Sequence, residues 1–284
     1  MAKTRDIKRR IRSIRNTMQV TRAMKMVSAA KLRRAQERIV AARPYARRML
    51  EVLRSLASRA NPEAHPLLAI REERRVDLLV ITGDKGLCGS FNTNVYKKAI
   101  AFLGERPGCD VRLHLLGRKG RDRFRRDRRP SAAEWTDFFR TLGAETAAEV
   151  SRGLVDAYTA GETDGVYVVY NEFKSMIQQR PVVERLLPLD RPTLAPGQAA
   201  EDYLYEPGAE ALFAELLPRH VDVQVYRSLL ESAAAENAAR MTAMDSASNN
   251  AADLIDSLTL NMNRVRQASI TTEIIEVVSG AEAL

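Results

Sequence analysis

The segment with the clearest chemical potential is the glycine-rich run Gly83–Ser90 (GDKGLCGS), which follows an apolar run and precedes a segment with helical spacing. A loop in this position could hold a phosphate group, because a helix N-terminus and its backbone N–H groups attract anions. Its spacing matches neither GxxxxGK[ST] nor GxGxxG, and Cys88 has no histidine or other base close to it in the sequence. We therefore predict a tight turn from a strand into a helix, in preference to a nucleotide site or a nucleophile.

A second candidate is the run 118–129 (RKGRDRFRRDRR), in which eight of twelve residues are basic. Such a run could contact phosphate groups or acidic lipids. The alternative is a solvated helix face, which the sequence favours because Phe124 is the only aromatic residue and offers no stacking platform.

Glu273 and Glu276 lie one helical turn apart near the C-terminus. A catalytic pair of carboxylates needs a concave pocket that perturbs their pKa values. On a long exposed helix the two residues are predicted to be structural or contact residues.

The two cysteines, Cys88 and Cys109, cannot form a disulfide framework, and with His65, His114 and His220 they show no zinc-binding spacing. No apolar run approaches the ~18 residues that cross a bilayer, and the N-terminus lacks the pattern of a signal peptide. The sequence therefore predicts no catalytic residue, cofactor or metal, and neither a membrane-spanning nor a secreted protein.

The net charge of +9 is distributed very unevenly along the chain. Residues 1–60 carry 18 basic and 3 acidic side chains, whereas the other 224 residues have a net charge of −6. An electrostatic partner is therefore expected to meet the N-terminal segment.

The N-terminal segment also has the pattern of a long helix that pairs with another helix. At alternating steps of four and three from Ile7, twelve of fifteen positions are apolar, which is a heptad seam. Its positions are Ile7, Ile11, Ile14, Met18, Thr21, Lys25, Ser28, Leu32, Ala35, Ile39, Ala42, Ala46, Met49, Leu53 and Leu56. The polar interruption at Thr21, Lys25 and Ser28 means that the partner helix is absent there or that another group accepts the charge of Lys25.

The C-terminal segment mirrors the first one. Residues 219–279 contain neither Gly nor Pro, and residues 219–284 have a net charge of −4. A seam is predicted at Met244, Ala247, Ala251, Leu254, Leu258, Asn261, Val265, Ala268, Thr272 and Ile275. Because both helices join the same central region and have opposite charge, they are expected to pair antiparallel within one chain.

The central region alternates between strand and helix patterns. Strands are predicted at Val76–Ile81, Val111–Leu116, Gly165–Tyr170 and Gln179–Leu187, helices at Phe91–Leu103 and 144–160, and a very basic helix or turn at Gly117–Arg129. This alternation predicts a mostly parallel sheet covered by helices. The predicted fold is therefore a long antiparallel coiled coil (1–58 and 219–284) with a small, Rossmann-like α/β domain (76–217) inserted between its helices.

Five segments resemble the gamma subunits of F-type ATP synthases, of bacterial type. They are Ile14–Arg33 with Ile7 before it, Arg43–Tyr45, Asp84–Gly89, Asp202–Pro207 and Arg266–Ala281. The resemblance extends over the whole chain. The chain lacks the cysteine-containing insertion of the plastid form, and its start at Met1 favours a bacterial protein over an organellar precursor.

The resemblance implies a rotor shaft without a catalytic site of its own. The coiled coil would turn inside a ring of three alpha and three beta subunits, and the α/β domain would rest on the epsilon subunit and the ring of c subunits. The protein would lie at the cytoplasmic face of the bacterial inner membrane, bound through the c ring, with nucleotide chemistry on the beta subunits.

The resemblance also implies contact residues. Met24, Lys25, Arg240 and Gln267 match positions of rotor–stator contact, and Lys25 stands where some relatives carry Glu. In this picture the interruption around Lys25 is an exposed stretch that meets another subunit. Tyr203, Tyr205 and Glu206 match the segment that contacts epsilon and the c ring.

One alternative from a different class remains open, namely a basic coiled-coil protein that binds nucleic acid or acts as a scaffold. It explains the charge of residues 1–60 but neither the α/β insertion nor the C-terminal motif.

Overall fold

The structure is a computed structural model that describes residues 2–57, 65–140, 142–190, 206 and 208–282. Its contacts divide the chain into two compact units. We call Met1–Ala29 with Arg240–Leu284 the helix-pair unit, and Ala30–Ala239 the α/β unit. None of the described helices is long and apolar enough to cross a membrane.

The α/β unit is built on a five-stranded sheet with the order β3-β2-β1-β4-β5. The strands are β1 (Arg75–Ile81), β2 (Asp110–Leu116), β3 (Ala133–Trp135), β4 (Gly165–Phe173) and β5 (Gln179–Leu187). All neighbouring pairs are parallel except β4 and β5, which form an antiparallel hairpin. The predicted, mostly parallel sheet is confirmed, and the short strand β3 was not predicted.

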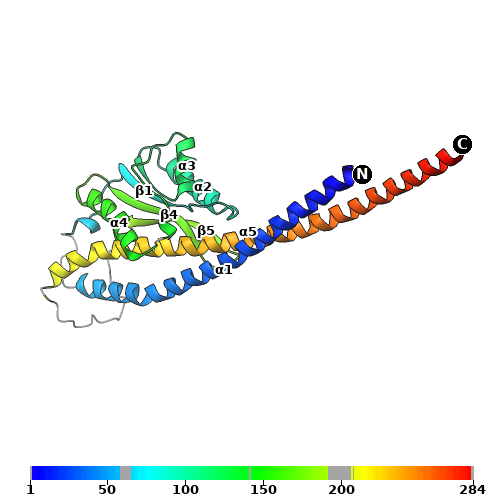
Figure 1. The fold of residues 1–284 in the computed structure, drawn as a ribbon. Helices are drawn as coiled ribbons and strands as arrows, with labels where there is room; N and C mark the ends of the chain where they lie inside the picture. Colours follow the sequence, from blue (N-terminus) through cyan, green and yellow to red (C-terminus); the bar gives the residue numbers. More distant parts are fainter. Residues whose placement is uncertain (1, 58–64, 141, 191–205, 207, 283–284) are drawn as a thin grey trace. The chain divides into compact units, whose positions relative to one another are not determined.

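Both faces of the sheet are covered by helices (Figure 1). Helices α2 (Phe91–Gly104) and α3 (Arg118–Arg126) cover one face, with Val95, Phe102 and Phe124 in the core beneath them. Helix α4 (Ala144–Thr159) covers the other face together with parts of the two long helices. This double cover explains why residues 76–81 are buried throughout, without the alternation of a half-exposed strand.

The two long helices are α1 (Ala2–Ala57) and α5 (Ala209–Glu282), and each contains one proline, Pro44 and Pro218. Helix α5 begins at Ala209 rather than at the expected residue 219, so Pro218 lies inside it. A proline cannot donate to the carbonyl four residues earlier, here that of Ala214. The side chain of His65 interacts with the backbone of Ala214, the residue whose carbonyl Pro218 leaves without its helical donor.

A buried ion pair joins the first two strands. Asp77 on β1 and Arg112 on β2 are register partners, and Asp77 is fully buried. The guanidinium donates two hydrogen bonds to the carboxylate, from Nε at 2.7 Å and from Nη2 at 2.8 Å. His114 Nε2 lies 3.3 Å from Asp77 Oδ1. Burial acts to raise the pKa of Asp77, but its contact with His114 and its hydrogen bonds and ion pair with Arg112 outweigh burial and lower the pKa.

Candidate functional site

In the helix-pair unit, the polar interruption of the α1 seam is paired with polar residues of α5. The hydroxyl groups of Thr21 and Ser248 lie 2.7 Å apart, and Lys25 Nζ lies 2.5 Å from Asp245 Oδ1. Thr21 is 9% exposed and Ser28 only 2%. The expectation of an exposed stretch that meets another subunit is therefore wrong at these positions. Asp245 is the group that accepts the charge of Lys25.

The same two contacts set the register of the antiparallel pair. Each step forward along α1 is matched by one step back along α5, so the first residues of α1 lie beside residues near ~267 of α5. The last turns of α5 therefore have no α1 beside them. The apolar side chains of Ile270, Ile274, Ile275 and Val278 are exposed there.

The predicted seam of α5 is correct where it begins, at Met244 and Ala251, and again at the half-buried Leu258 and Val265, but its other positions beyond Ala251 are wrong. Met244 and Ala251 are buried, but Leu254 is 53% exposed while its neighbour Ile255 is half-buried. The half-buried side chains continue at Leu258, Met262 and Val265. The sequence offers apolar residues at both 254 and 255, so spacing alone did not identify the one that faces α1. The predicted seam positions Asn261, Ala268, Thr272 and Ile275 are exposed.

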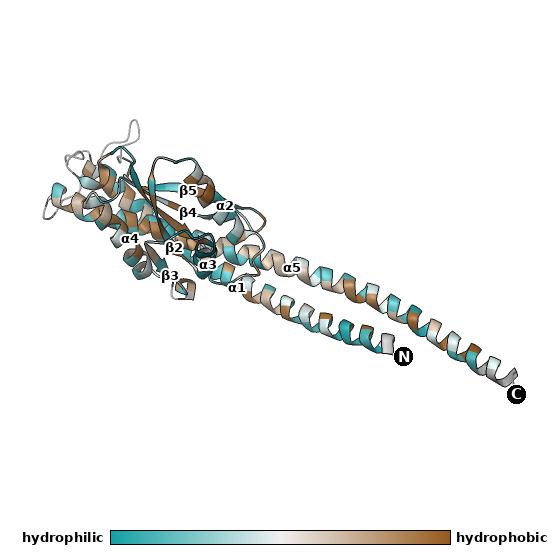
Figure 2. Cartoon of the chain, turned by 90° about the horizontal axis from the view of Figure 1, so that it is seen from above, coloured by the Kyte–Doolittle hydropathy of each residue, from teal (hydrophilic) through white to brown (hydrophobic). Residues whose placement is uncertain are grey.

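Exposed apolar side chains also lie on α1 within this unit. They are Val20, Met26 and Val27, each more than half exposed and outside the seam. Figure 2 shows apolar residues interspersed with polar ones along both helices. A helix that exposes large apolar side chains next to arginines offers both dispersion and electrostatic contact to a partner.

The four expected rotor–stator residues differ in their surroundings. Met24 and Arg240 are half-buried, and Gln267 is exposed on α5. Lys25 is half-buried and paired with Asp245, so its charge is already compensated within the chain. Arg22, Arg33 and Arg34 on α1 are exposed, and Arg33 pairs only with Glu37 one turn away.

For the expected foot contact, Glu206 is exposed, and Tyr203 and Tyr205 lie outside the described residues. Glu273 and Glu276 are exposed on α5, as expected for structural or contact residues.

The loop Gly83–Ser90 forms the predicted tight turn. Its own polar groups are used inside the α/β unit: the N–H of Gly83 donates to Asn92 Oδ1, and Asp84 Oδ1 accepts from the N–H groups of Arg118 and Asp137. Leu87 and Gly89 have positive φ, which reverses the chain direction in few residues. Cys88 is buried beside Phe91 and Ala235. The turn thus joins β1 to α2 and caps α3.

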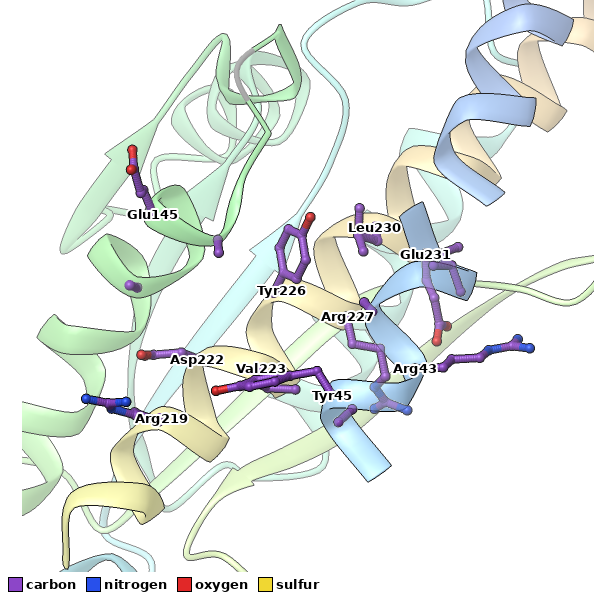
Figure 3. Close-up of a pocket in the computed structure, with 15 residues that line it drawn as sticks. Arg43, Tyr45, Glu145, Arg219, Asp222, Val223, Tyr226, Arg227, Leu230 and Glu231 are labelled. Atoms are coloured by element: carbon purple, nitrogen blue, oxygen red, sulfur yellow. The ribbon is translucent and has the colours of Figure 1, made fainter. Parts of the chain in front are cut away.

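A pocket of about 580 Å³ lies in the α/β unit between α1, α4 and α5 (Figure 3). Its wall is mainly apolar, and its charged groups are largely engaged. Asp222 accepts a hydrogen bond from the buried Ser151 hydroxyl, Arg227 donates to Glu184, and Arg219 pairs with Glu215 at 2.6 Å.

Glu231 differs from these three residues. Burial raises the pKa of its carboxyl group, against the opposing charge of Arg227. Its Oε2 atom is buried and has no hydrogen-bond partner among the described residues. The described part of the wall brings no nucleophile and base together, and the described chain as a whole groups no three metal-ligating side chains. Neither the pocket nor the turn offers a catalytic arrangement.

A protein-family model described as ATP synthase matches residues 3–284. The chain is 53% identical over 282 residues to the ATP synthase gamma chain of Solibacter usitatus (strain Ellin6076), with 98% of each chain covered. It is 50% identical over 286 residues to the ATP synthase gamma chain of Geobacter sp. (strain M21), covering 100% of this chain and 99% of that one.

Solved structures agree with these relatives. A chain from the central stalk and c-ring of the Tetrahymena thermophila mitochondrial ATP synthase is 27% identical, with a TM-score of 0.59 over 81% of this chain and 99% of that one. A chain of the Euglena gracilis mitochondrial ATP synthase is similar in fold, with a TM-score of 0.71 at 19% identity over 99% of this chain and 94% of that one. Since the family model covers nearly the whole chain and both curated relatives match it along their full length, the chain belongs to the family of ATP synthase gamma chains.

Proposed function

We propose that this chain is the central rotor shaft of an F-type ATP synthase. It couples proton flow through the c ring to ATP synthesis on the beta subunits by rotating inside the ring of three alpha and three beta subunits. It is a non-catalytic subunit of the enzyme complex. The observation that carries this proposal is the match to gamma chains over the full length at about half identity.

The contacts of the helix pair suit this role. A shaft must transmit torque without its helices sliding past each other, and the Thr21–Ser248 and Lys25–Asp245 contacts oppose such a slip. A shift by one residue would separate Lys25 from Asp245 and the buried Thr21 hydroxyl from Ser248, and a buried hydroxyl without a partner costs free energy. The polar pairs therefore act as a register lock between α1 and α5.

The partners are the alpha and beta subunits, the epsilon subunit and the c ring, and the association with the membrane is indirect, through the c ring. For a bacterial enzyme the location is the cytoplasmic face of the inner membrane. The absence of a membrane-spanning helix among the described residues is consistent with a peripheral subunit.

For the rotor–stator contact, Met24, Arg240 and Gln267 remain the proposed residues, together with the exposed Arg22, Arg33 and Arg34. Lys25 is expected to contribute less to this contact than the other residues, because its salt bridge to Asp245 already compensates its charge. Tyr203, Tyr205 and Glu206 are proposed to contact epsilon and the c ring, and the exposure of Glu206 supports that role.

The test of this function is co-purification. The tagged chain, expressed in its native cell, should retain the alpha and beta subunits, which mass spectrometry would identify. If nucleic acid is retained in their place, the alternative of a basic coiled-coil nucleic-acid protein is correct and the rotor proposal fails.

Removing three charges from α1 should weaken assembly with the alpha–beta ring in a salt-dependent way. Exposed ion pairs contribute only about 0.2–1 kcal/mol each, and the screening length is about 10 Å at 0.1 M salt. The variant Arg22→Gln/Arg33→Gln/Arg34→Gln is expected to bind about tenfold more weakly at low salt and within about twofold of the wild type at high salt. Binding of the ring would be measured across a salt series.

The matched control removes three exposed charges from the α/β unit, as Arg128→Gln/Arg129→Gln/Arg152→Gln. It should follow the wild-type curve. If the binding curves of the α1 variant and the wild type superimpose at every salt concentration, the basic face of α1 is solvated and does not contact the ring.

A further inference from the structure

A second pocket, of about 450 Å³, lies in the α/β unit between α2 and α3. Lys97 comes from α2, and Lys119, Arg123 and Arg126 come from one face of α3, at spacings of four and three residues. Asp122 is the only acidic residue in the wall. We call this feature the α2–α3 pocket.

The cations of α3 divide into two groups according to where they point. Three that do not line the pocket each have an acidic partner: Arg118 with Asp137 at 2.6 Å, Arg121 with Asp122 at 2.9 Å, and Arg125 with Glu134 at 2.8 Å. These pairs explain how a helix with six basic residues in nine is stable. They also engage Asp122, which would otherwise balance charge in the pocket.

The cations that line the pocket have few acidic partners to compensate their positive charge. Arg123 lies 3.6 Å from Asp127 and stacks over the ring of Tyr96, and the hydroxyl of Tyr96 also donates to Asp127. Lys97, Lys119 and Arg126 have no ion-pair partner among the described residues. Their side chains are exposed, and three like charges around one hollow create a positive potential that attracts anions.

Two helix N-termini border the pocket. Asn92 and Thr93 in the wall are the second and third residues of α2, and Lys119 and Gly120 hold the same places in α3. The N–H groups at the start of α3 already donate to Asp84, Gly83 and Thr82, so the helix dipole that adds positive potential at the pocket is that of α2. The Asn92 amide is engaged with Cys88 and Gly83, and the Thr93 hydroxyl supplies a further hydrogen-bond donor.

We propose that the α2–α3 pocket binds a phosphate-rich anion, a further site beyond the shaft function. The unpaired cations and the Thr93 hydroxyl suit phosphate oxygens. Arg123 already covers a face of Tyr96, the aromatic residue of the wall, so no stacking platform is left for a nucleobase. The ligand is thus the phosphate group of a membrane lipid or a free diphosphate or polyphosphate, since both present the same chemistry.

The experiment uses the full chain and two probes. Inorganic diphosphate is titrated by calorimetry, and flotation is measured with vesicles of phosphatidylcholine with and without phosphatidylglycerol. The pocket variant is Lys97→Gln/Lys119→Gln/Arg126→Gln. The control Arg118→Gln/Arg125→Gln/Arg129→Gln removes equal charge from exposed cations outside the wall and keeps Arg121 paired with Asp122. Emission of Trp135, the only tryptophan, verifies that both variants keep the folded α/β unit.

The pocket variant should bind at least tenfold more weakly than the wild type, and the control should stay within about twofold. Binding of diphosphate would assign a free anion, and flotation only with phosphatidylglycerol would assign a lipid headgroup. Equal losses in both variants would show a response to net charge alone and overturn the proposal. So would a wild-type chain that binds neither probe.

Discussion

Cysteines at positions 21 and 248 should join α1 and α5 by a disulfide within one chain, almost completely and under mild oxidation. The hydroxyl groups of Thr21 and Ser248 lie 2.7 Å apart, so their β-carbons are within reach of a bond of about 2.05 Å between sulfurs. The variant is Thr21→Cys/Ser248→Cys in a background of Cys88→Ala and Cys109→Ala. Non-reducing gel electrophoresis would show a faster-moving single chain.

The link closes a very long loop and should stabilise the helix pair by about 5 kcal/mol in the chain-entropy account. It should not impede ATP hydrolysis by the assembled complex, because both helices belong to the rotor and turn together. The rate of ATP hydrolysis therefore distinguishes a disulfide within this chain from a disulfide between this chain and an alpha or beta subunit.

The control variant is Thr21→Cys/Ser246→Cys. Ser246 is exposed on α5, and two residues of helix rotate a side chain by about 200°, away from α1. It should crosslink slowly or not at all. Equal crosslinking of the two variants, or crosslinks only between separate chains, would contradict the register of the helix pair.

Arg112→Met should lower the free energy of unfolding of the α/β unit by about 3 kcal/mol. The change leaves the carboxylate of Asp77 fully buried, with His114 at 3.3 Å as its remaining partner. The expected loss lies at the low end for a broken buried pair, because the Arg112 side chain is 33% exposed and partly solvated. Urea unfolding followed by Trp135 emission would measure it, since Trp135 stacks on His114 inside this unit.

Two comparisons make the result specific. Arg74→Met breaks an exposed pair with Glu72 and should change the stability by less than about 0.5 kcal/mol. The double variant Asp77→Leu/Arg112→Met removes both charges and should recover most of the loss. A loss of the same size in the double variant would mean that packing of the Arg112 side chain matters more than its charge.

The acid response of Asp77 follows from its lowered pKa. A carboxyl group whose folded pKa lies below its unfolded value adds stability above the unfolded pKa, and this stability is lost as the pH falls towards the folded pKa. The wild type should therefore lose stability relative to the double variant as the pH falls below about 4. An unchanged difference between pH 6 and pH 3 would mean that Asp77 does not contribute in this way.

Local patterns were sufficient to predict most of the elements. The apolar runs at 76–81 and 111–116 became β1 and β2, and the helical spacing at 91–103 and 144–160 became α2 and α4. The α1 seam was predicted position by position, because a pattern of seven heptad repeats has only one continuous face to bury. The family, and with it the rotor role, could also be predicted from long local motifs.

Other features depend on which distant residues meet, and they emerged only with the folded chain. Nothing near Lys25 in the sequence identifies Asp245 as its partner, and nothing near Asp77 identifies Arg112, because each pair is created by register between separate elements. For the same reason spacing could not choose between Leu254 and Ile255. The α2–α3 pocket is a similar case: the basic run 118–129 was visible from the start, but only the fold separates the cations that have acidic partners from those that face a cavity. Periodicity specifies which face of an element is buried, whereas charge pairing and cavities are properties of two elements at once.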